Sequence, residues 1–129
     1  MTGAPSVRRL KTYSSQPGYV YQYSYEGQRP YHAGANRDND TGTEFVFRLS
    51  ADRKNWCSVH VLVAGTAIRA WEQAHERTLS STEHYAIAKV ALFQAFDERA
   101  TPALMKQDVK VRPADVEAIL ETLGIAPSD

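Results

Sequence analysis

The sequence predicts an α+β domain in which a three- to four-stranded antiparallel sheet is followed by three helices packed on one face. Apolar and polar side chains alternate in three segments before residue 64, which is typical of half-buried strands. After Gly65 the apolar period lengthens to that of a helix. Because the strands come first and the helices afterwards, we expect the helices to be segregated from the sheet rather than interleaved with it.

The first strand is predicted at residues 19–26, where every second residue is a tyrosine. A pleated strand sends alternate side chains to opposite faces, so the four phenol rings share one face. The other face is mostly polar and cannot form a core. We therefore expect the tyrosine row to be buried; it comprises Tyr19, Tyr21, Tyr23 and Tyr25.

Residues 27–42 have no apolar period and are rich in Gly, Pro, Asn and Asp, which predicts a long loop. Long loops in compact domains are often functional. We take four residues of this segment as candidate binding residues, namely Arg29, Tyr31, His32 and Arg37. The alternative is that residues 27–42 are only a solvated connection between two strands. The segment carries both basic and acidic residues, so it indicates no particular ligand charge.

Two further strands are predicted at residues 43–50 and 56–63, joined by the polar turn 51–55 as an antiparallel hairpin. In the first of these strands, Phe45, Phe47 and Leu49 share a face. In the second, both faces carry apolar residues, and the sequence leaves open which one is buried. Cys57 and His60 point to opposite faces there, which disfavours a thiol–imidazole pair.

The first helix is predicted from an N-cap at Thr66 to about Leu79. Ser80 and Glu83 match a capping box and open a second helix that ends near Glu98. This helix is apolar nearly all round, so we expect it to be the central helix of the fold. Its second apolar arc is a candidate interface, covered either by the third helix or by a second copy of the chain; it comprises Ile87, Val90 and Phe93.

The third helix is predicted between Pro113 and Gly124, with Ile125 as the hydrophobic contact of a Schellman motif. Residues 103–112 are ambiguous, and residues 109–111 are a candidate edge strand. The cluster Asp97-Glu98-Arg99 is interpreted as a solvated helix end. We expect a flexible N-terminal tail at 1–17, one domain at 18–125 and a C-terminal tail at 126–129.

Net charge, cysteine count and the length of apolar runs exclude or disfavour several classes of protein. The chain has 129 residues, with 15 basic and 15 acidic ones, so its formal net charge is zero. That balance disfavours a dedicated double-stranded DNA binder. The single cysteine excludes an intramolecular disulfide. Without a signal-peptide pattern or an apolar run long enough to cross a bilayer, a cytoplasmic location is expected.

The sequence carries no recognisable catalytic signature. Its four histidines lack metal-ligand spacing, and we find no Gly-rich phosphate loop and no nucleophile elbow. We therefore expect no catalytic residues, no metal and no cofactor.

Three functional hypotheses remain. The first is a small non-catalytic binding or adaptor module, either homodimeric or with a protein partner. The alternative is a single-stranded nucleic-acid-binding domain that uses the tyrosine-lined strand together with nearby basic residues, which are Arg8, Arg9, Lys11, Arg29 and Arg48. A weaker alternative is a small enzyme of unknown reaction class.

Overall fold

The structure is a computed structural model that describes residues 9–32 and 41–125. Five strands, three α-helices and one 3₁₀ helix follow one another within these residues. In chain order they are β1 (Lys11–Ser14), β2 (Val20–His32), β3 (Thr41–Ser50), β4 (Cys57–Val63), α1 (Gly65–His75), α2 (Ser81–Glu98), η2 (Pro102–Lys106), β5 (Val109–Val111) and α3 (Pro113–Leu123). The chain is therefore α+β, as the sequence predicts.

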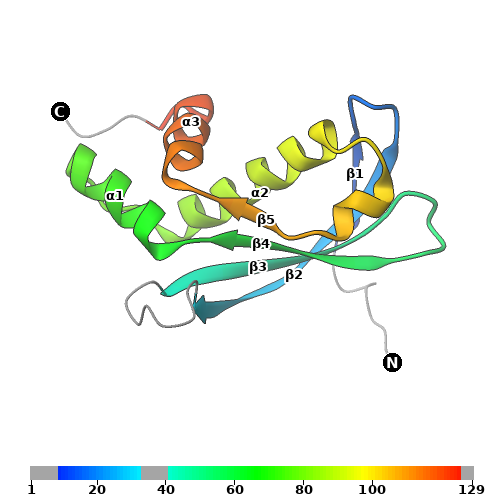
Figure 1. Ribbon diagram of the computed structural model, residues 1–129, viewed down its shortest axis with the longest axis horizontal. Coiled ribbons are helices and arrows are strands. Elements are labelled where there is room, and N and C mark those ends of the chain that lie inside the picture. The colour runs from blue at the N-terminus through cyan, green and yellow to red at the C-terminus, as the bar shows by residue number, and fades with distance from the viewer. Residues whose placement is uncertain (1–8, 33–40, 126–129) are drawn as a thin grey trace.

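The sheet has five strands in the order β1-β2-β3-β4-β5, with the three helices on one side of it (Figure 1). The first three pairings are antiparallel, but β5 pairs with β4 in parallel. The predicted sheet of three to four antiparallel strands is thus only roughly right. The difference arises because α1 and α2 intervene between β4 and β5, and a long crossover can return the chain in the same direction.

Strand β1 lies in the segment that we expected to be a tail. It has only four residues and is mostly polar, so its sequence offers little strand signal. Packing explains its order. Tyr13 lies against Phe93 of α2, with ring centroids 4.6 Å apart, and its hydroxyl donates to Asp97 at 2.7 Å.

Strands β2 and β3 extend beyond their predicted ends, so that Arg29, Tyr31 and His32 belong to a strand and not to a loop. A bulge between Tyr25 and Gly27 interrupts the ladder, and Gly27 has a φ of 147°. Pro30 and charged residues suit the end of a strand near a sheet edge, which is why this stretch resembles a loop in sequence. Arg37 and Arg8, two residues of our hypotheses, lie outside the described residues.

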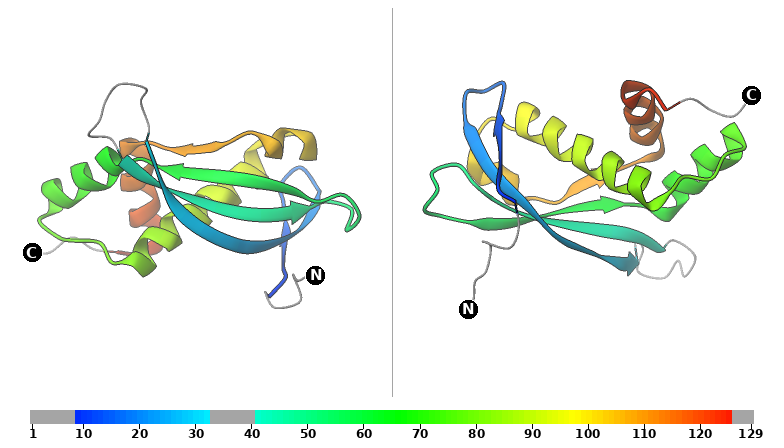
Figure 2. Two further views of the ribbon diagram at one scale, coloured as in Figure 1. Left: turned by 90° about the horizontal axis from the view of Figure 1, so that it is seen from below. Right: turned by 180° about the vertical axis from the view of Figure 1, so that it is seen from behind.

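The core lies between the concave face of the curved sheet and α2, which crosses that face (Figure 2). Tyr21 is fully buried and stacks on Phe96 at 4.4 Å, and Tyr23 is buried beside it. The prediction that the tyrosine row faces the core is confirmed for these two residues, whereas Tyr19 is 37% exposed. The inward face of β4, which the sequence leaves open, carries Val59, Val61 and Val63.

The helix ends agree with the sequence at the start of α2 and the end of α3, but not for α1, which ends at His75 rather than near Leu79 because Glu76 adopts the left-handed conformation. Ser80 and Glu83 form the predicted capping box of α2. Gly124 ends α3 in the left-handed conformation, and the Ile125 amide donates to Leu120 as a Schellman motif requires. The N-cap of α1 is not Thr66. It is Ala64, which makes no side-chain capping bond.

Candidate functional site

The predicted binding residues are not brought together as one loop. Arg29 and Tyr31 lie on the outer, convex face of the sheet. There Arg29 pairs with Glu44 of β3, and Tyr31 crosses Gly42, whose missing side chain leaves room for the ring. His32 is bonded instead to the hydroxyl of Thr41, at 3.2 Å. These three residues therefore fasten β2 to β3 and do not converge on a common point.

Glu44 is the centre of a charged cluster on this outer face. One carboxylate oxygen accepts from Arg29 Nε at 2.7 Å, and the other contacts Nδ1 of His60 on β4. The hydrogen bond from Arg29, followed by that from His60, holds the pKa of Glu44 below its usual value. The Glu44 side chain is only 14% exposed, and its two contacts link β3 to β2 on one side and to β4 on the other.

The cluster of Arg29, Glu44 and His60 does not form a catalytic triad. With Nδ1 directed at a carboxylate, His60 has the arrangement of a general base, which still needs a nucleophile. Ser58 shares the face two residues earlier, but no hydrogen bond joins it to His60 in the described part of the chain. Sequence reasoning missed this cluster, because alternation shows which residues face outward but not which of them become cross-strand neighbours.

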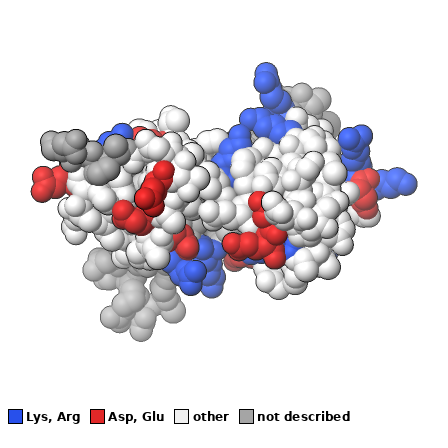
Figure 3. All heavy atoms as spheres, turned by 90° about the horizontal axis from the view of Figure 1, so that it is seen from above, with Lys and Arg blue, Asp and Glu red and all other residues white. Residues whose placement is uncertain are grey.

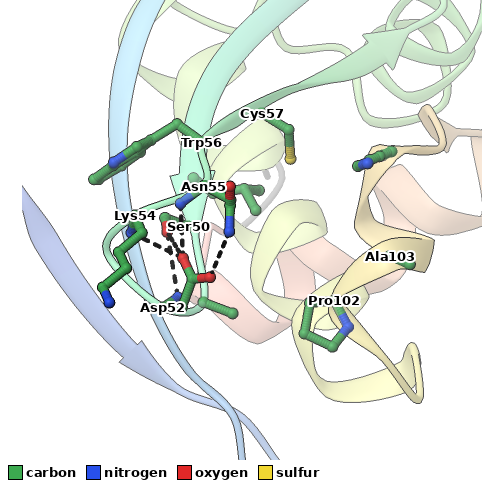
Figure 4. A pocket seen from close by; sticks show the side chains of 11 residues that line it. Ser50, Asp52, Lys54, Asn55, Trp56, Cys57, Pro102 and Ala103 are labelled. Carbon is green, nitrogen blue, oxygen red and sulfur yellow. Dashed lines mark hydrogen bonds between the residues drawn. The ribbon is translucent and has the colours of Figure 1, made fainter.

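A cavity of about 480 Å³ lies at the opposite end of the sheet, between the β3–β4 turn and η2. Cys57 and Asn55 lie on the strand side and face Pro102 and Ala103 across it, whereas Lys54 and Trp56 extend to the other side of the turn (Figure 4). The volume falls within the range of small-molecule sites.

Asp52 shapes the turn that forms one wall of the cavity. Its Oδ1 accepts from the backbone amides of Lys54 and Asn55, both at 2.8 Å, and its Oδ2 accepts from the Asn55 amide group at 2.8 Å. Ser50 adds a further bond at 3.0 Å. These donors, first the Asn55 amide, keep the pKa of Asp52 far below its usual value. The carboxylate is thus fully used in holding the turn.

Arg99 fixes the other wall. Its guanidinium donates to the backbone carbonyls of Leu104 and Gln107 through Nη1 and of Asp108 through Nη2, at 2.7 to 2.9 Å. Burial lowers the pKa of Arg99. The sequence interpretation of Arg99 as part of a solvated helix end is therefore wrong, because its side chain folds back over η2 and ties it to the end of α2.

Cys57 is the one thiol of the chain, and it lines the cavity. Burial raises its pKa, and the nearby charge of Lys106 only partly opposes this. A thiol with a raised pKa is protonated at neutral pH and is a poor nucleophile. The cavity therefore offers apolar walls, a neutral thiol, the amide of Asn55 and the ammonium groups of Lys54 and Lys106, of which Lys54 extends to the other side of the turn, but no activated nucleophile.

The residues of the candidate interface have different environments. Ile87 is fully buried, and Ala91, on the same side of α2 one turn later, lines a small space shared with Ile119 of α3. Val90 and Phe93 are only half-buried. Part of the second arc is thus covered within the chain, and the part formed by Val90 and Phe93 remains at the surface.

The charges on the helical side are unevenly distributed. Figure 3 shows a run of basic side chains beside the grey atoms at the upper margin, with the acidic side chains lying apart from it.

In residues 9–32 and 41–125, no group of three or more His, Cys, Asp or Glu is placed to hold a metal ion. Over the same residues, no helix is long and apolar enough to cross a membrane.

We compared the chain with protein-family models, curated proteins and solved structures, and none of them matches it.

Proposed function

We propose that the protein is a non-catalytic binding module that holds a small ligand in the cavity between the β3–β4 turn and η2. One observation carries the proposal: a cavity of about 480 Å³ whose two walls are fixed by internal hydrogen bonds of Asp52 and Arg99. Preformed walls favour binding, because little conformational entropy is lost when the ligand enters.

The lining indicates the chemistry of the ligand. Leu49, Pro102 and Ala103 supply apolar contacts, while Asn55 and Lys106 supply hydrogen-bond donors. We therefore expect a ligand with an apolar body and one anionic or acceptor group. The neutral Cys57 thiol and the fully bonded Asp52 carboxylate favour binding over catalysis.

Binding of the dye 8-anilinonaphthalene-1-sulfonate tests the proposal, because the dye combines apolar rings with one sulfonate. We expect saturable fluorescence enhancement that is abolished by Ala103→Trp, which fills the cavity. Ala100→Trp is the matched control, because Ala100 is exposed and outside the lining. Lys106→Met should weaken dye binding by roughly three- to tenfold through loss of one charge contact. Equal enhancement in all folded variants would contradict the proposal.

A homodimer or a protein partner remains a prediction, as does a cytoplasmic location. Any contact through the second arc of α2 would rest on Val90 and Phe93, because Ile87 lies inside the chain. Light scattering of the wild type and of Val90→Lys measures this directly. A dimer that Val90→Lys leaves intact would exclude this surface.

Two of the four tyrosines that the nucleic-acid hypothesis uses, Tyr21 and Tyr23, are buried beneath α2, which argues against base stacking on them, whereas Tyr19 is 37% exposed. Its basic residues are also partly engaged: Arg29 pairs with Glu44, and Arg48 lies over the Trp56 ring at 5.3 Å. A gel shift with a single-stranded oligonucleotide still tests whether the chain binds nucleic acid through other residues.

A further inference from the structure

Two lysines from distant parts of the sequence come together where α2 passes β1 at the edge of the sheet. Lys11 is the first residue of β1, and Lys89 lies in the middle of α2. Lys11 lies opposite Tyr23 in the β1–β2 pairing, the Tyr23 ring contacts that of Phe93 at 5.7 Å, and the amino group of Lys89 lies 5.9 Å from the same Phe93 ring, so the two amino groups extend into one neighbourhood. Both groups are donors when charged, so they repel each other unless an acceptor lies between them.

Neighbouring contacts fix this meeting. Tyr13 of β1 stacks on Phe93 of α2 at 4.6 Å with an interplanar angle of 12°. Lys11 precedes Tyr13 by two strand residues, or about 6.6 Å. Lys89 precedes Phe93 by one helical turn, or about 6 Å. The stacking of Tyr13 on Phe93 therefore places Lys11 and Lys89 at similar distances from the contact between β1 and α2.

The pair makes no ion pair with an acidic residue in the described part of the chain. Asp97, two turns after Lys89 on the same side of α2, already accepts from the Tyr13 hydroxyl and from the Gln16 amide at 3.0 Å. The two positive charges are therefore left without an acid partner among residues 9–32 and 41–125.

Aromatic rings keep Lys89 in place. Its amino group lies 6.0 Å from the ring centroid of Tyr85 and 5.9 Å from that of Phe93. Such contacts attract a cation but accept few of its hydrogen bonds. Burial, together with the nearby positive charge of Lys11, lowers the pKa of Lys89, as expected for a cation without an acidic partner. An ordinary surface lysine would swing away from a like charge, whereas this side chain is held near one.

We propose that Lys11 and Lys89 together bind the phosphate group of a small phosphate monoester. A dianionic, tetrahedral phosphate can accept hydrogen bonds from both ammonium groups and neutralise both charges. The rings of Tyr85 and Phe93 flank the site and favour a ligand with a ring or other flat group next to the phosphate. This site is distinct from the cavity at η2, and neither depends on the other.

The test is a titration of the full chain with inorganic phosphate and with phenyl phosphate. Sodium chloride keeps the ionic strength constant, and amide and lysine NMR shifts report binding. We expect saturable shifts around residues 11 and 89, with phenyl phosphate binding several-fold more tightly than inorganic phosphate. Lys11→Met and Lys89→Met should each lower the affinity at least tenfold. Lys110→Met is the control, because Lys110 is exposed on β5, and it should leave the affinity unchanged.

Three outcomes would overturn the proposal. In the first, phosphate shifts the spectrum no more than chloride does. In the second, Lys110→Met weakens binding as much as the other variants, which would indicate unspecific attraction. In the third, a single-stranded oligonucleotide binds through Lys11 and Lys89 while both small phosphates do not. Lys11→Met keeps the test informative if Lys89→Met fails to fold, because Lys11 is exposed on a short strand.

Discussion

Two neighbouring positions on the sheet-facing side of α2 differ in how completely the fold covers them. Phe96 is fully buried and stacks on Tyr21, so its contacts are complete. Phe93, one turn earlier, is only half-buried, and the amino group of Lys89 lies 5.9 Å from its ring centroid. The same side of the helix thus passes from the centre of the core to a partly exposed stretch that carries a charge. The difference separates residues that stabilise the fold from residues available for binding.

The largest expected effect comes from truncating each phenylalanine. Phe96→Ala should lower the free energy of unfolding by about 3–5 kcal/mol, because it opens a cavity in the core. Phe93→Ala should cost only about 1–2 kcal/mol, because its ring is partly exposed. Urea denaturation measures both. Equal losses would show that Phe93 belongs to the core as fully as Phe96 does.

The hydrogen bond between Tyr13 and Asp97 ties β1 to the last turns of α2. That hydrogen bond, with burial and the charge of Asp97, raises the pKa of Tyr13 to about 12. Asp97→Asn should bring this pKa back toward 10 and cost about 1 kcal/mol of stability. In the wild type, stability should fall as the pH rises from 10 toward 12, because the unfolded chain ionises first.

Ultraviolet absorbance at alkaline pH follows the tyrosine titration, and Tyr13→Phe identifies which transition belongs to Tyr13. A late transition that survives Asp97→Asn would contradict the assignment. It would also weaken the argument that Asp97 is too occupied to neutralise Lys89.

Asp52 provides a contrast, since the fold satisfies its charge completely. Its lowered pKa means that it stabilises the folded chain above about pH 4 and that this contribution is lost as the pH falls further. Asp52→Asn should therefore show a shallower loss of thermal stability between pH 4 and pH 2 than the wild type. Parallel pH profiles of the two melting temperatures would contradict this.

Lys89→Met should have the smallest effect and the opposite sign. Its lowered pKa means that the unfolded chain holds its proton more tightly, so wild-type stability should rise as the pH approaches 10.5. Removing the charge should raise stability at pH 7 by less than about 1 kcal/mol. Thermal melts at pH 7 and pH 9.5 measure both effects. A loss of stability at pH 7 would show that the charge is compensated.

The sequence predicts best what local pattern determines. Alternation placed Tyr21 and Tyr23 in the core, and Ser80 with Glu83 marked the start of α2. It failed for β1, because four mostly polar residues form a strand only through the packing of Tyr13 on α2.

The candidate sites were harder to predict, for a related reason. Glu44 and His60 meet through strand register, and Lys11 and Lys89 meet through a contact between the first strand and the central helix. Neither pairing can be predicted from the spacing of these residues along the chain. The four predicted binding residues share only their chemical type and an apparent loop, and in the structure Arg29 is bound to Glu44.

The parallel pairing of β5 with β4 has a consequence for how the chain folds. Strands β1 to β4 join neighbours in sequence, so they can assemble early, whereas β5 reaches β4 only after α1 and α2 have been made. Closing so long a segment is slow. During synthesis the backbone hydrogen-bonding groups on the edge of β4 at Val61 and Val63 therefore stay unpaired until β5 is made. A nascent chain halted after α2 should be prone to aggregate through this edge.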